Sequence, residues 1–538
     1  MYLDTSTLNK NGKVFTRHLL RTSFREDGKV KHKTIANVSA CSEDEIAAIR
    51  LALKHKNNLS AVASLDDMKI VLGKRIGAAW VVNVLAERLG IAKALGKDRD
   101  GKLALLQVLA RIIDQGSRLS AVRLAQSHAL CEILEIQKLD EDDLYENLDW
   151  LSKHQEAIEK SLFELRFPNA VPTLFLYDVT SSYLEGTCNA LADWGYDRDK
   201  KRGKKQIVVG LLAGPDGLPV AVRVFKGNTN DTKTVSEQVK ILADCFGVKE
   251  VTLVGDRGMI KGPQIDALPE DFRYITAITK PQIAKMLDED VLQYNLFDDH
   301  VCEVNLQGIR YILRRNPVRA QQLAAVRESK AVSLRALAER CTQYLAEHPK
   351  ANVEKSAEKV RAKIEKLKAQ PWLSVNNAGR TITVDNDDAA RAEVALLDGC
   401  YVIKSDVPKN HADAQMLHDR YCDLESVERS FRTMKTAHLE MRPVFVQKEE
   451  STRGHVFVVM LALLVQRELE KSWKTLDMTV AEGIDELAAI HMQEVQLGAT
   501  RIQNIPAPTL IGAQLLSKAG VTLPSVLPSK KVRVHTKK

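Results

Sequence analysis

Between residues 172 and 280 the helical periodicity gives way to apolar segments separated by turn residues, and this stretch constrains the fold most. PTLFLYDVTSSYLEG, KQIVVGLLAG and LPVAVRVFKGN predict three strands, the last two joined by a hairpin turn at Pro215-Asp216-Gly217. DTKTVSEQVKILADCFG predicts a helix with Asp231 or Thr232 as its N-cap. KEVTLVGDRGM and RYITAITK predict two further strands.

This order of three strands, a helix and two more strands is that of a ribonuclease-H-like mixed sheet, an α/β layer fold. We therefore predict a catalytic core whose first part is residues 166–280. Its second part, residues 397–480, begins with a strand in ALLDGCYVIKSD and continues as a long helical region from about Ala412 to Lys471, broken near Arg442.

Residues 281–396 interrupt this core and predict a basic, largely helical insertion domain. Its polar middle, 317–370, favours a long helical hairpin broken near His348-Pro349. Between Arg314 and Lys368, 14 Lys and Arg residues stand against 6 Asp and Glu residues, a net charge of +8 that equals that of the whole chain. Two interpretations are open: a solvated two-helix arm, or a surface that contacts DNA.

Three regions flank the core. Residues 1–42 predict a β-hairpin with its turn at Asp27-Gly28. Residues 43–165 have mostly helical periodicity, typical either of a DNA-binding domain or of a domain that only packs. Residues 481–538 form a C-terminal region that ends in the basic tail SKKVRVHTKK, which can contact phosphates.

Composition excludes several classes of protein. Hydrophobic residues make up 45% and charged residues 28% of the 538 residues, as in ordinary globular proteins, so a globally disordered chain is excluded. The eight cysteines contain no CxxC pair, which favours reduced thiols. The longest strongly apolar run, 456–465, is shorter than the roughly 20 residues needed to span a bilayer. We expect a cytoplasmic, nucleoid-associated protein without membrane contact.

Two aspartates are placed for metal-dependent phosphodiester chemistry, which needs carboxylates because Mg²⁺ prefers oxygen ligands. Asp178 lies inside the otherwise apolar FLYDVTSS, where a carboxylate is costly unless it is paired or metal-bound. Asp256 follows the strand in TLVGDRGM, at the carboxyl edge of the sheet. The structural alternatives are a strand-end Asp178 that accepts backbone hydrogen bonds, and a turn-capping Asp256 paired with Arg257.

A third acid lies in the helical segment YCDLESVERSFRTMKT. Tyr421, Glu428 and Lys435 are spaced by seven residues each, so on one helix they share an arc of about 40°. This stripe can place a metal ligand between two phosphate contacts, although an amphipathic helix with solvated charges gives the same spacing. Rival metal ligands are Glu185, Asp231 and Glu425.

These segments resemble DDE insertion-sequence transposases that carry a Y-R-E-K signature, in which Tyr, Arg, Glu and Lys follow at fixed spacing. The resemblance also covers YDVTSSYLEG, WGYDRDKKRGKKQIVVGLL and VGDRGM, and spans about residues 165–280 and 396–470. It implies that Asp178, Asp256 and Glu428 are the catalytic metal ligands, and that Tyr421 and Lys435 hold DNA phosphates. The signature arginine is replaced by Leu424, which we expect to pack against the core.

Further DNA contacts are expected around the site. Arg432 is the best substitute for the missing arginine, since it lies about 20° from Tyr421 around a continuous helix, whereas Arg429 lies about 80° away. Trp194 and Trp372 are candidates for stacking on an extruded base. A basic cluster follows the first strand and is expected to contact phosphates; it consists of Arg198, Lys200, Lys201, Arg202, Lys204 and Lys205.

The function predicted from this pattern is that of a DNA transposase. It would hydrolyse the phosphodiester at the element's ends and transfer the freed 3′-OH into target DNA, using Mg²⁺ with Mn²⁺ as a substitute. Its expected partners are double-stranded DNA, as terminal inverted repeats and target, and a second copy of the chain in a homodimer on DNA. The alternatives are a related metal nuclease without strand transfer and a non-catalytic DNA-binding derivative.

Overall fold

A computed structural model describes residues 1–10, 13–57, 68–257, 259–260, 262–266, 268–436, 439–442, 444–497, 500–527 and 533–534. These residues fall into two compact units. The first combines residues 1–84, 123–138 and 472–534, and the second, which holds the predicted catalytic core, combines residues 85–122 and 139–471. Almost all of the predicted basic tail lies outside the described residues.

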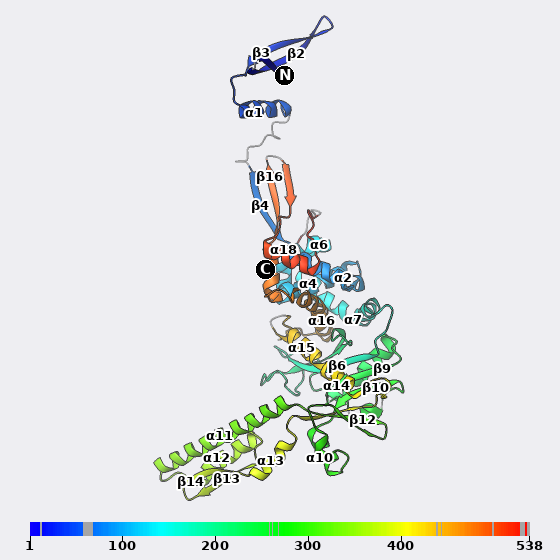
Figure 1. The fold of residues 1–538 in the computed structure, drawn as a ribbon, viewed down its shortest axis with the longest axis vertical. Helices are drawn as coiled ribbons and strands as arrows, with labels where there is room; N and C mark the ends of the chain where they lie inside the picture. Colours follow the sequence, from blue (N-terminus) through cyan, green and yellow to red (C-terminus); the bar gives the residue numbers. More distant parts are fainter. Residues whose placement is uncertain are drawn as a thin grey trace. The chain divides into compact units, whose positions relative to one another are not determined.

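The core of the second unit is an eight-stranded mixed sheet (Figure 1). Its order is β11-β12-β15-β10-β9-β6-β7-β8. Strand β6 pairs in parallel with β9 and β9 with β10, and all other neighbours are antiparallel. The strands are β6 (Leu174–Tyr183), β7 (Gln206–Ala213), β8 (Pro219–Lys226), β9 (Val251–Gly255), β10 (Phe272–Ala277), β11 (Cys302–Leu306), β12 (Ile309–Arg315) and β15 (Cys400–Ser405).

The predicted order of elements and the ribonuclease-H-like fold class are confirmed. Strands β6 to β8 are followed by helix α8 (Asp231–Lys240) and then by β9 and β10, with the short α9 (Gly262–Asp266) between them. The β7–β8 turn holds Gly217 at a φ of +75°, in the region that favours glycine. The N-cap of α8 is Asn230, whose side chain accepts from the backbone N–H of Thr232, so the predicted caps Asp231 and Thr232 are wrong.

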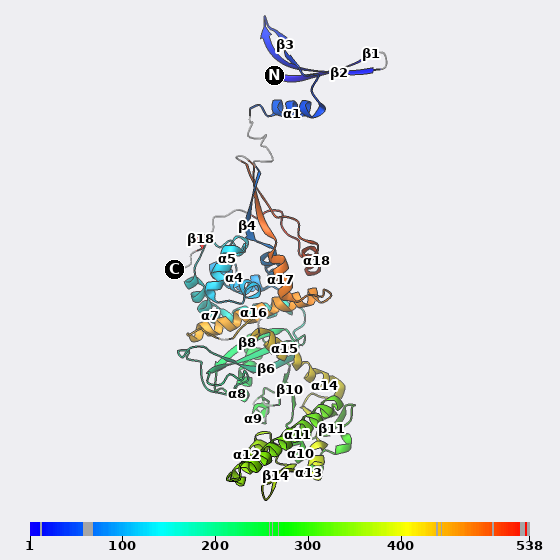
Figure 2. The same cartoon turned by 90° about the vertical axis from the view of Figure 1, so that its left-hand side faces the viewer.

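The two faces of the sheet differ. Phe175, Tyr177 and Val179 share one face of β6 and pack in a core that also contains side chains of α8 and of the π-helix Ile241–Cys245. Phe163 of helix α7 (Glu141–Arg166) joins the same core. Asp178 lies on the opposite face because side chains alternate along a strand. Helix α15 (Leu424–Lys435) packs along β6 in both Figure 1 and Figure 2.

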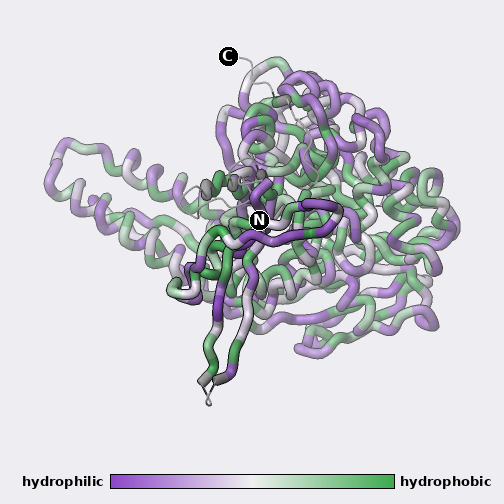
Figure 3. The backbone as a smooth tube through the Cα atoms, turned by 90° about the horizontal axis from the view of Figure 1, so that it is seen from above, coloured by the Kyte–Doolittle hydropathy of each residue, from purple (hydrophilic) through white to green (hydrophobic). Residues whose placement is uncertain are grey.

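The predicted helical hairpin of the insertion is confirmed as α11 (Pro317–Glu347) and α12 (Val353–Lys366). It packs with the strands β13 (Leu373–Ala378) and β14 (Thr381–Asn386) around its own apolar core (Figure 2). Hydrophilic and hydrophobic residues alternate along the two helices (Figure 3), as one face of each is buried. Strands β11 and β12, between α10 (Lys280–Asp288) and α11, extend the core sheet. Helix α13 (Asp388–Leu396) ends the insertion.

The second part of the core contains three helices, α14 (Ala414–Cys422), α15 and α16 (Glu449–Trp473). The expectation of one helix from Tyr421 to Lys435 is wrong because α14 ends at Cys422 and α15 begins at Leu424, with Asp423 between them. Residues 456–463 of α16 are all buried, so this apolar run belongs to the core. Among the described residues, no helix has the length and apolar character needed to cross a membrane.

The predicted hairpin at Asp27-Gly28 is confirmed in a three-stranded sheet of β1 (Tyr2–Lys10), β2 (Lys13–Glu26) and β3 (Lys29–Asn37). Residues 43–165 are not entirely helical, because β4 (Met68–Arg75) pairs with β16 (His491–Leu497), which also pairs with β17 (Thr500–Asn504). The other elements are α1 (Glu43–Lys54), α2 (Gly77–Arg88), α3 (Ile91–Leu95), α4 (Arg99–Ile113), α5 (Arg118–Ser127), α6 (Leu130–Leu134), β5 (Lys138–Leu139), the 3₁₀ turn Tyr294–Leu296, α17 (Val480–Ala488), α18 (Leu510–Ala519) and β18 (Arg533–Val534).

Candidate active site

Asp178 and Asp256 lie next to each other at one edge of the parallel pair β6–β9. In the register of this pair Tyr177 is the partner of Gly255; Asp178 is the next residue of β6, and Asp256 directly follows the end of β9. Neighbouring strands are roughly 4.8 Å apart, so the two carboxylates leave the sheet from adjacent positions. Each aspartate accepts a hydrogen bond from the following backbone N–H, that of Val179 at 2.8 Å and that of Arg257 at 2.7 Å.

Glu428 approaches these aspartates from α15. The buried residues Leu424, Val427, Phe431 and Met434 recur every three or four positions and fix the face that packs on the core. Glu428 lies about 80° from the centre of that face, whereas Glu425 lies about 140° away and its side chain is 80% exposed. Helix orientation therefore favours Glu428 over Glu425 as the third acid.

The electrostatics of Asp178 depend on both of the other acids. Burial, together with the negative charges of Asp256 and Glu428, raises the pKa of Asp178 to about 7. The Val179 N–H and the Arg198 guanidinium act in the opposite direction and compensate only in part. A half-buried carboxylate near two others, without an ion pair of its own among the described residues, is a position at which a cation is stabilised.

Tyr421 contacts the second aspartate directly, since its hydroxyl donates to Asp256 Oδ1 at 3.3 Å. Burial and the negative charge of Asp256 raise the pKa of this phenol, so it stays protonated and donates. The break at Asp423 therefore does not remove Tyr421 from the site.

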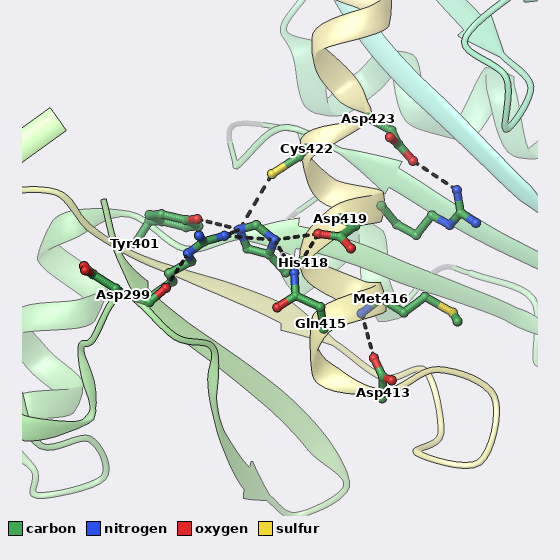
Figure 4. A network of polar contacts seen from close by, with 11 residues as sticks. Asp299, Tyr401, Asp413, Gln415, Met416, His418, Asp419, Cys422 and Asp423 are labelled. Atoms are coloured by element: carbon green, nitrogen blue, oxygen red, sulfur yellow. Dashed lines mark hydrogen bonds and ion pairs between the residues drawn. The ribbon is translucent and has the colours of Figure 1, made fainter. Parts of the chain in front are cut away.

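Helix α14, which carries Tyr421, is held by a polar network around buried His418 (Figure 4). The ring Nε2 of His418 lies 2.6 Å from the hydroxyl of Tyr401 on β15 and 3.0 Å from the guanidinium of Arg314 on β12. Its Nδ1 lies 3.0 Å from Asp419 on α14 itself. These contacts join α14 to the far strands of the sheet and thereby position Tyr421.

Lys435, predicted to bind phosphate, is held inside the protein by a buried carboxylate. Its Nζ lies 2.8 Å from Asp199 Oδ1, and Arg442 pairs with the same oxygen. The other oxygen of Asp199 accepts from the backbone N–H of Tyr183 at 3.1 Å. This cluster, Asp199 with Lys435 and Arg442, fastens the loop between β6 and β7 to the end of α15.

The basic cluster in this loop is partly neutralised by two of the rival ligands. Arg198 binds Asp231 through both carboxylate oxygens at 2.7 and 2.6 Å, and Lys204 pairs with Glu185 at 2.5 Å. Lys201 lies over the ring of Tyr183. The others, Lys200, Arg202 and Lys205, have no ion pair among the described residues; Lys200 and Arg202 are exposed and Lys205 is half-buried. Glu185 and Asp231 thus have cationic partners, which weakens them as metal ligands.

The remaining predicted residues differ in how far they are exposed to solvent. Leu424 is buried, as predicted. Arg432 is exposed on α15, about 40° beyond Glu428 around the helix. Trp194 is 59% exposed and stays a candidate for stacking, but Trp372 is 3% exposed in the core of the insertion, where Arg391 covers its ring, so it offers no surface to a base.

Comparison with known proteins identifies the family. The transposase DDE domain matches residues 169–465, more than half of the chain. This chain belongs to the DDE transposases. The N-terminal domain of IS1634 family transposases matches residues 3–63 of this transposase. No curated protein matches it. A solved structure, the piggyBac transposase in a synaptic complex with hairpin DNA, is 9% identical over 73% of this chain and 70% of its own, with a TM-score of 0.38.

The family makes this transposase dependent on divalent metal ions. The donor set fits such an ion, because three carboxylates supply the oxygen ligands that hard cations prefer and Asp178 forms no ion pair within the described residues. As the side chains stand, no group of three Asp, Glu, His or Cys residues in the described part of the chain is close enough to hold a metal. Bringing the three carboxylates within reach of one ion therefore requires rotation of side chains, and the exposed side chain of Glu428 is free to rotate.

Sequence reasoning missed the residues that support the site. Asp199, Arg442 and His418 were not predicted to have a role. Only Asp199 left a local signal, as an acid inside the basic segment DRDKKRGKK.

Proposed function

We propose that this transposase cuts the phosphodiester at its element's ends and joins the freed 3′-OH to target DNA, with Asp178, Asp256 and Glu428 as the metal ligands. The observation that carries the proposal is the register of β6 and β9, which places Asp178 beside Asp256, with Glu428 close enough for its charge to raise the pKa of Asp178. Mg²⁺ is the proposed ion, with Mn²⁺ as substitute. When bound, the metal supplies a Lewis acid that stabilises the attacking and leaving oxygens.

The chain's own residues position the DNA. Tyr421 donates its single O–H to Asp256, and on DNA binding this proton is proposed to turn from that carboxylate to a phosphate oxygen. Lys435 has two N–H groups beyond the one that meets Asp199, so it can bridge that carboxylate and a phosphate. Arg432 projects from the exposed side of α15 toward solvent and is proposed to contact a neighbouring phosphate in place of the signature arginine.

The proposal extends to the partners. DNA is the family's substrate, and we propose that terminal inverted repeats are its specific form and that the protein is associated with the nucleoid. Because two ends must be joined together, a homodimer on DNA is proposed. The unpaired cations Lys200, Arg202 and Lys205 give the β6–β7 loop a surface for the backbone of that DNA.

The test measures cleavage of an intact end and strand transfer of a pre-cut end by Glu428→Gln and Glu425→Gln. Glu428→Gln is expected to lower end cleavage and joining on the order of 1,000-fold, since it removes a metal ligand. Glu425→Gln is the matched control on the same helix and is expected to stay within a few-fold of wild type. Normal joining by Glu428→Gln with loss in Glu425→Gln would reverse the assignment, and cleavage without any joining by the wild type would favour a nuclease.

The insertion is predicted to bind the DNA backbone without sequence preference. Lys355, Lys359 and Lys366 are exposed on α12, and Lys363 is half-buried on the same helix. Neutralising all four should weaken binding to any duplex and flatten the dependence of log affinity on log salt, by about 0.9 for each phosphate that these lysines no longer neutralise. Titrations of two unrelated duplexes at several salt concentrations measure this. An unchanged slope for both duplexes would show that α11 and α12 form a solvated arm that does not contact DNA.

A further inference from the structure

A cavity of about 340 Å³ in the second unit is lined by an excess of cations. Arg111 at the end of α4, Arg118 at the start of α5 and Arg442 line it together with His455 of α16. Among its described lining residues Glu440 is the only acid. Tyr145 and Phe445, 41% and 69% exposed, add two aromatic rings.

Two of these arginines are buried without an anionic partner. Arg111 and Arg118 are each 5% exposed, and no ion pair joins either to a carboxylate in the described part of the chain. Arg111 donates to the carbonyl oxygen of Gln115 at 2.6 Å, and Arg118 donates to the side-chain oxygen of Gln107 and to His455. Elsewhere in the same unit the buried Arg223 shows the usual arrangement, with Glu159 at 2.7 Å.

Both arginines stay charged at neutral pH, although burial lowers their pKa values. The pKa of Arg111 falls to about 10, and that of Arg118, which Arg111 also repels, falls to about 9. Glu440 and Asp114 raise the pKa of Arg111, but Glu440 is exposed and Asp114 accepts a hydrogen bond from the hydroxyl of Ser120. Two buried positive charges side by side are unfavourable unless an anion joins them.

His455 orients Arg118 and supplies no charge of its own. Its Nδ1 accepts from Arg118 at 3.1 Å and its Nε2 donates to the carbonyl oxygen of Met441 at 3.2 Å, which fixes the neutral tautomer. Burial and the two arginines lower the pKa of His455, in agreement with this tautomer. The ring thus holds the Arg118 guanidinium against the cavity wall.

The cavity is connected to the catalytic residues through Arg442. The Nε of Arg442 donates to the carbonyl oxygen of Lys435 at 3.2 Å, and its NH1 pairs with Asp199. Val444, near Phe445 of the cavity wall, exchanges backbone hydrogen bonds with Tyr183 and Glu185 at the end of β6, the strand that carries Asp178. The side chain of Arg442 therefore both lines the cavity and contacts Lys435.

We propose that the cavity binds a backbone phosphate of the DNA that occupies the active site, with Arg111 and Arg118 as its ligands. A guanidinium pair matches phosphate oxygens in charge and in hydrogen-bond geometry, and a phosphate supplies the missing anion. The inference rests on the proposed function, which brings DNA to Lys435. A free nucleotide carries the same chemistry, and the experiment separates the two sources.

The experiment compares R111Q and R118Q with R123Q in the full-length protein. Arg123 is an exposed residue of α5 that does not line the cavity. Its substitution therefore removes one positive charge from the same helix as the substitution of Arg118. R111Q and R118Q are expected to weaken binding of an end duplex roughly tenfold and to lower the salt slope by about 0.9, whereas R123Q leaves both unchanged. Without DNA, both cavity variants should melt at a higher temperature than wild type, because an unpaired buried charge is gone.

Each outcome decides the proposal. Unchanged affinity and slope in R111Q overturn it even if R118Q fails to fold. A lower melting temperature for both variants, with unchanged affinity and slope of their folded fraction, would show that the arginines act only in folding. A melting temperature raised by ATP in wild type but not in R111Q, with equal DNA slopes, would assign the cavity to a free nucleotide. Failure of wild type to cut DNA while it binds with the predicted slope difference would overturn the proposed function alone.

Discussion

Asp178→Asn should abolish end cleavage and at the same time make the metal-free protein more stable at pH 8. Cleavage is expected to fall on the order of 1,000-fold or more, because an amide is a poor ligand for a hard cation. Stability should rise because burial and the charges of Asp256 and Glu428 oppose the carboxylate of Asp178. Asparagine keeps the side-chain oxygen that accepts from Val179, so the change removes charge without removing that hydrogen bond.

The sign and the pH window follow from the pKa of Asp178. Its folded value of about 7 is above its ordinary value of 3.8, so the folded protein holds this proton more tightly than the unfolded chain. Stability from this group is complete below about pH 4 and is lost as the pH rises to about 7. At about 1.4 kcal/mol per pKa unit, the variant should gain about 2 to 4 kcal/mol in free energy of unfolding at pH 8 and little at pH 4.

Urea unfolding in chelator at pH 4, 6 and 8 measures this gain. Asp231→Asn is the matched control, since Asp231 pairs with Arg198 at 2.6 Å and its charge has a partner. That variant should be no more stable than wild type at any of these pH values. A less stable Asp178→Asn at pH 8 would show that its carboxylate is stabilised in the fold, and the argument for a shared cation site would fail.

The sequence predicted most of the sheet because each core strand carries its own local signal. Strands β6 to β10 are apolar segments ended by turn residues, and their order places Asp178 beside Asp256 without any knowledge of distances. Strand β4 escaped prediction because its partner β16 lies more than 400 residues later and its own apolar residues are exposed. Local patterns do not report such long-range pairing.

The site was predicted less fully, and the reason lies in its side-chain partners. A spacing of seven on a helix found Tyr421, Glu428 and Lys435, but it assumed a continuous helix and did not show the break at Asp423. Asp231 and Glu185 looked like rival ligands until the structure paired them with Arg198 and Lys204. Such pairs depend on the fold bringing loop residues together, which periodicity cannot encode.

Asp199 is the most consequential residue that this reasoning missed, and Asp199→Ala is predicted to cost about 3 to 5 kcal/mol of stability. Its side chain is 2% exposed and accepts from Lys435, Arg442 and the backbone of Tyr183. Removing the carboxylate leaves Lys435 and Arg442 without the anion that neutralises them, and Lys435 is itself mostly buried. Burial already lowers the pKa of Lys435, so an unpaired ammonium is poorly tolerated there.

The matched control is Asp197→Ala, two residues earlier in the same loop, whose side chain has no ion pair among the described residues. This substitution should lower the free energy of unfolding, measured in urea, by less than about 1 kcal/mol. The double variant Asp199→Ala with Lys435→Met should recover part of the loss, with a coupling free energy of about 1 to 3 kcal/mol, because the second change removes the stranded charge. Equal losses in Asp197→Ala and Asp199→Ala, or strict additivity with Lys435→Met, would show that Asp199 does not hold the β6–β7 loop to α15.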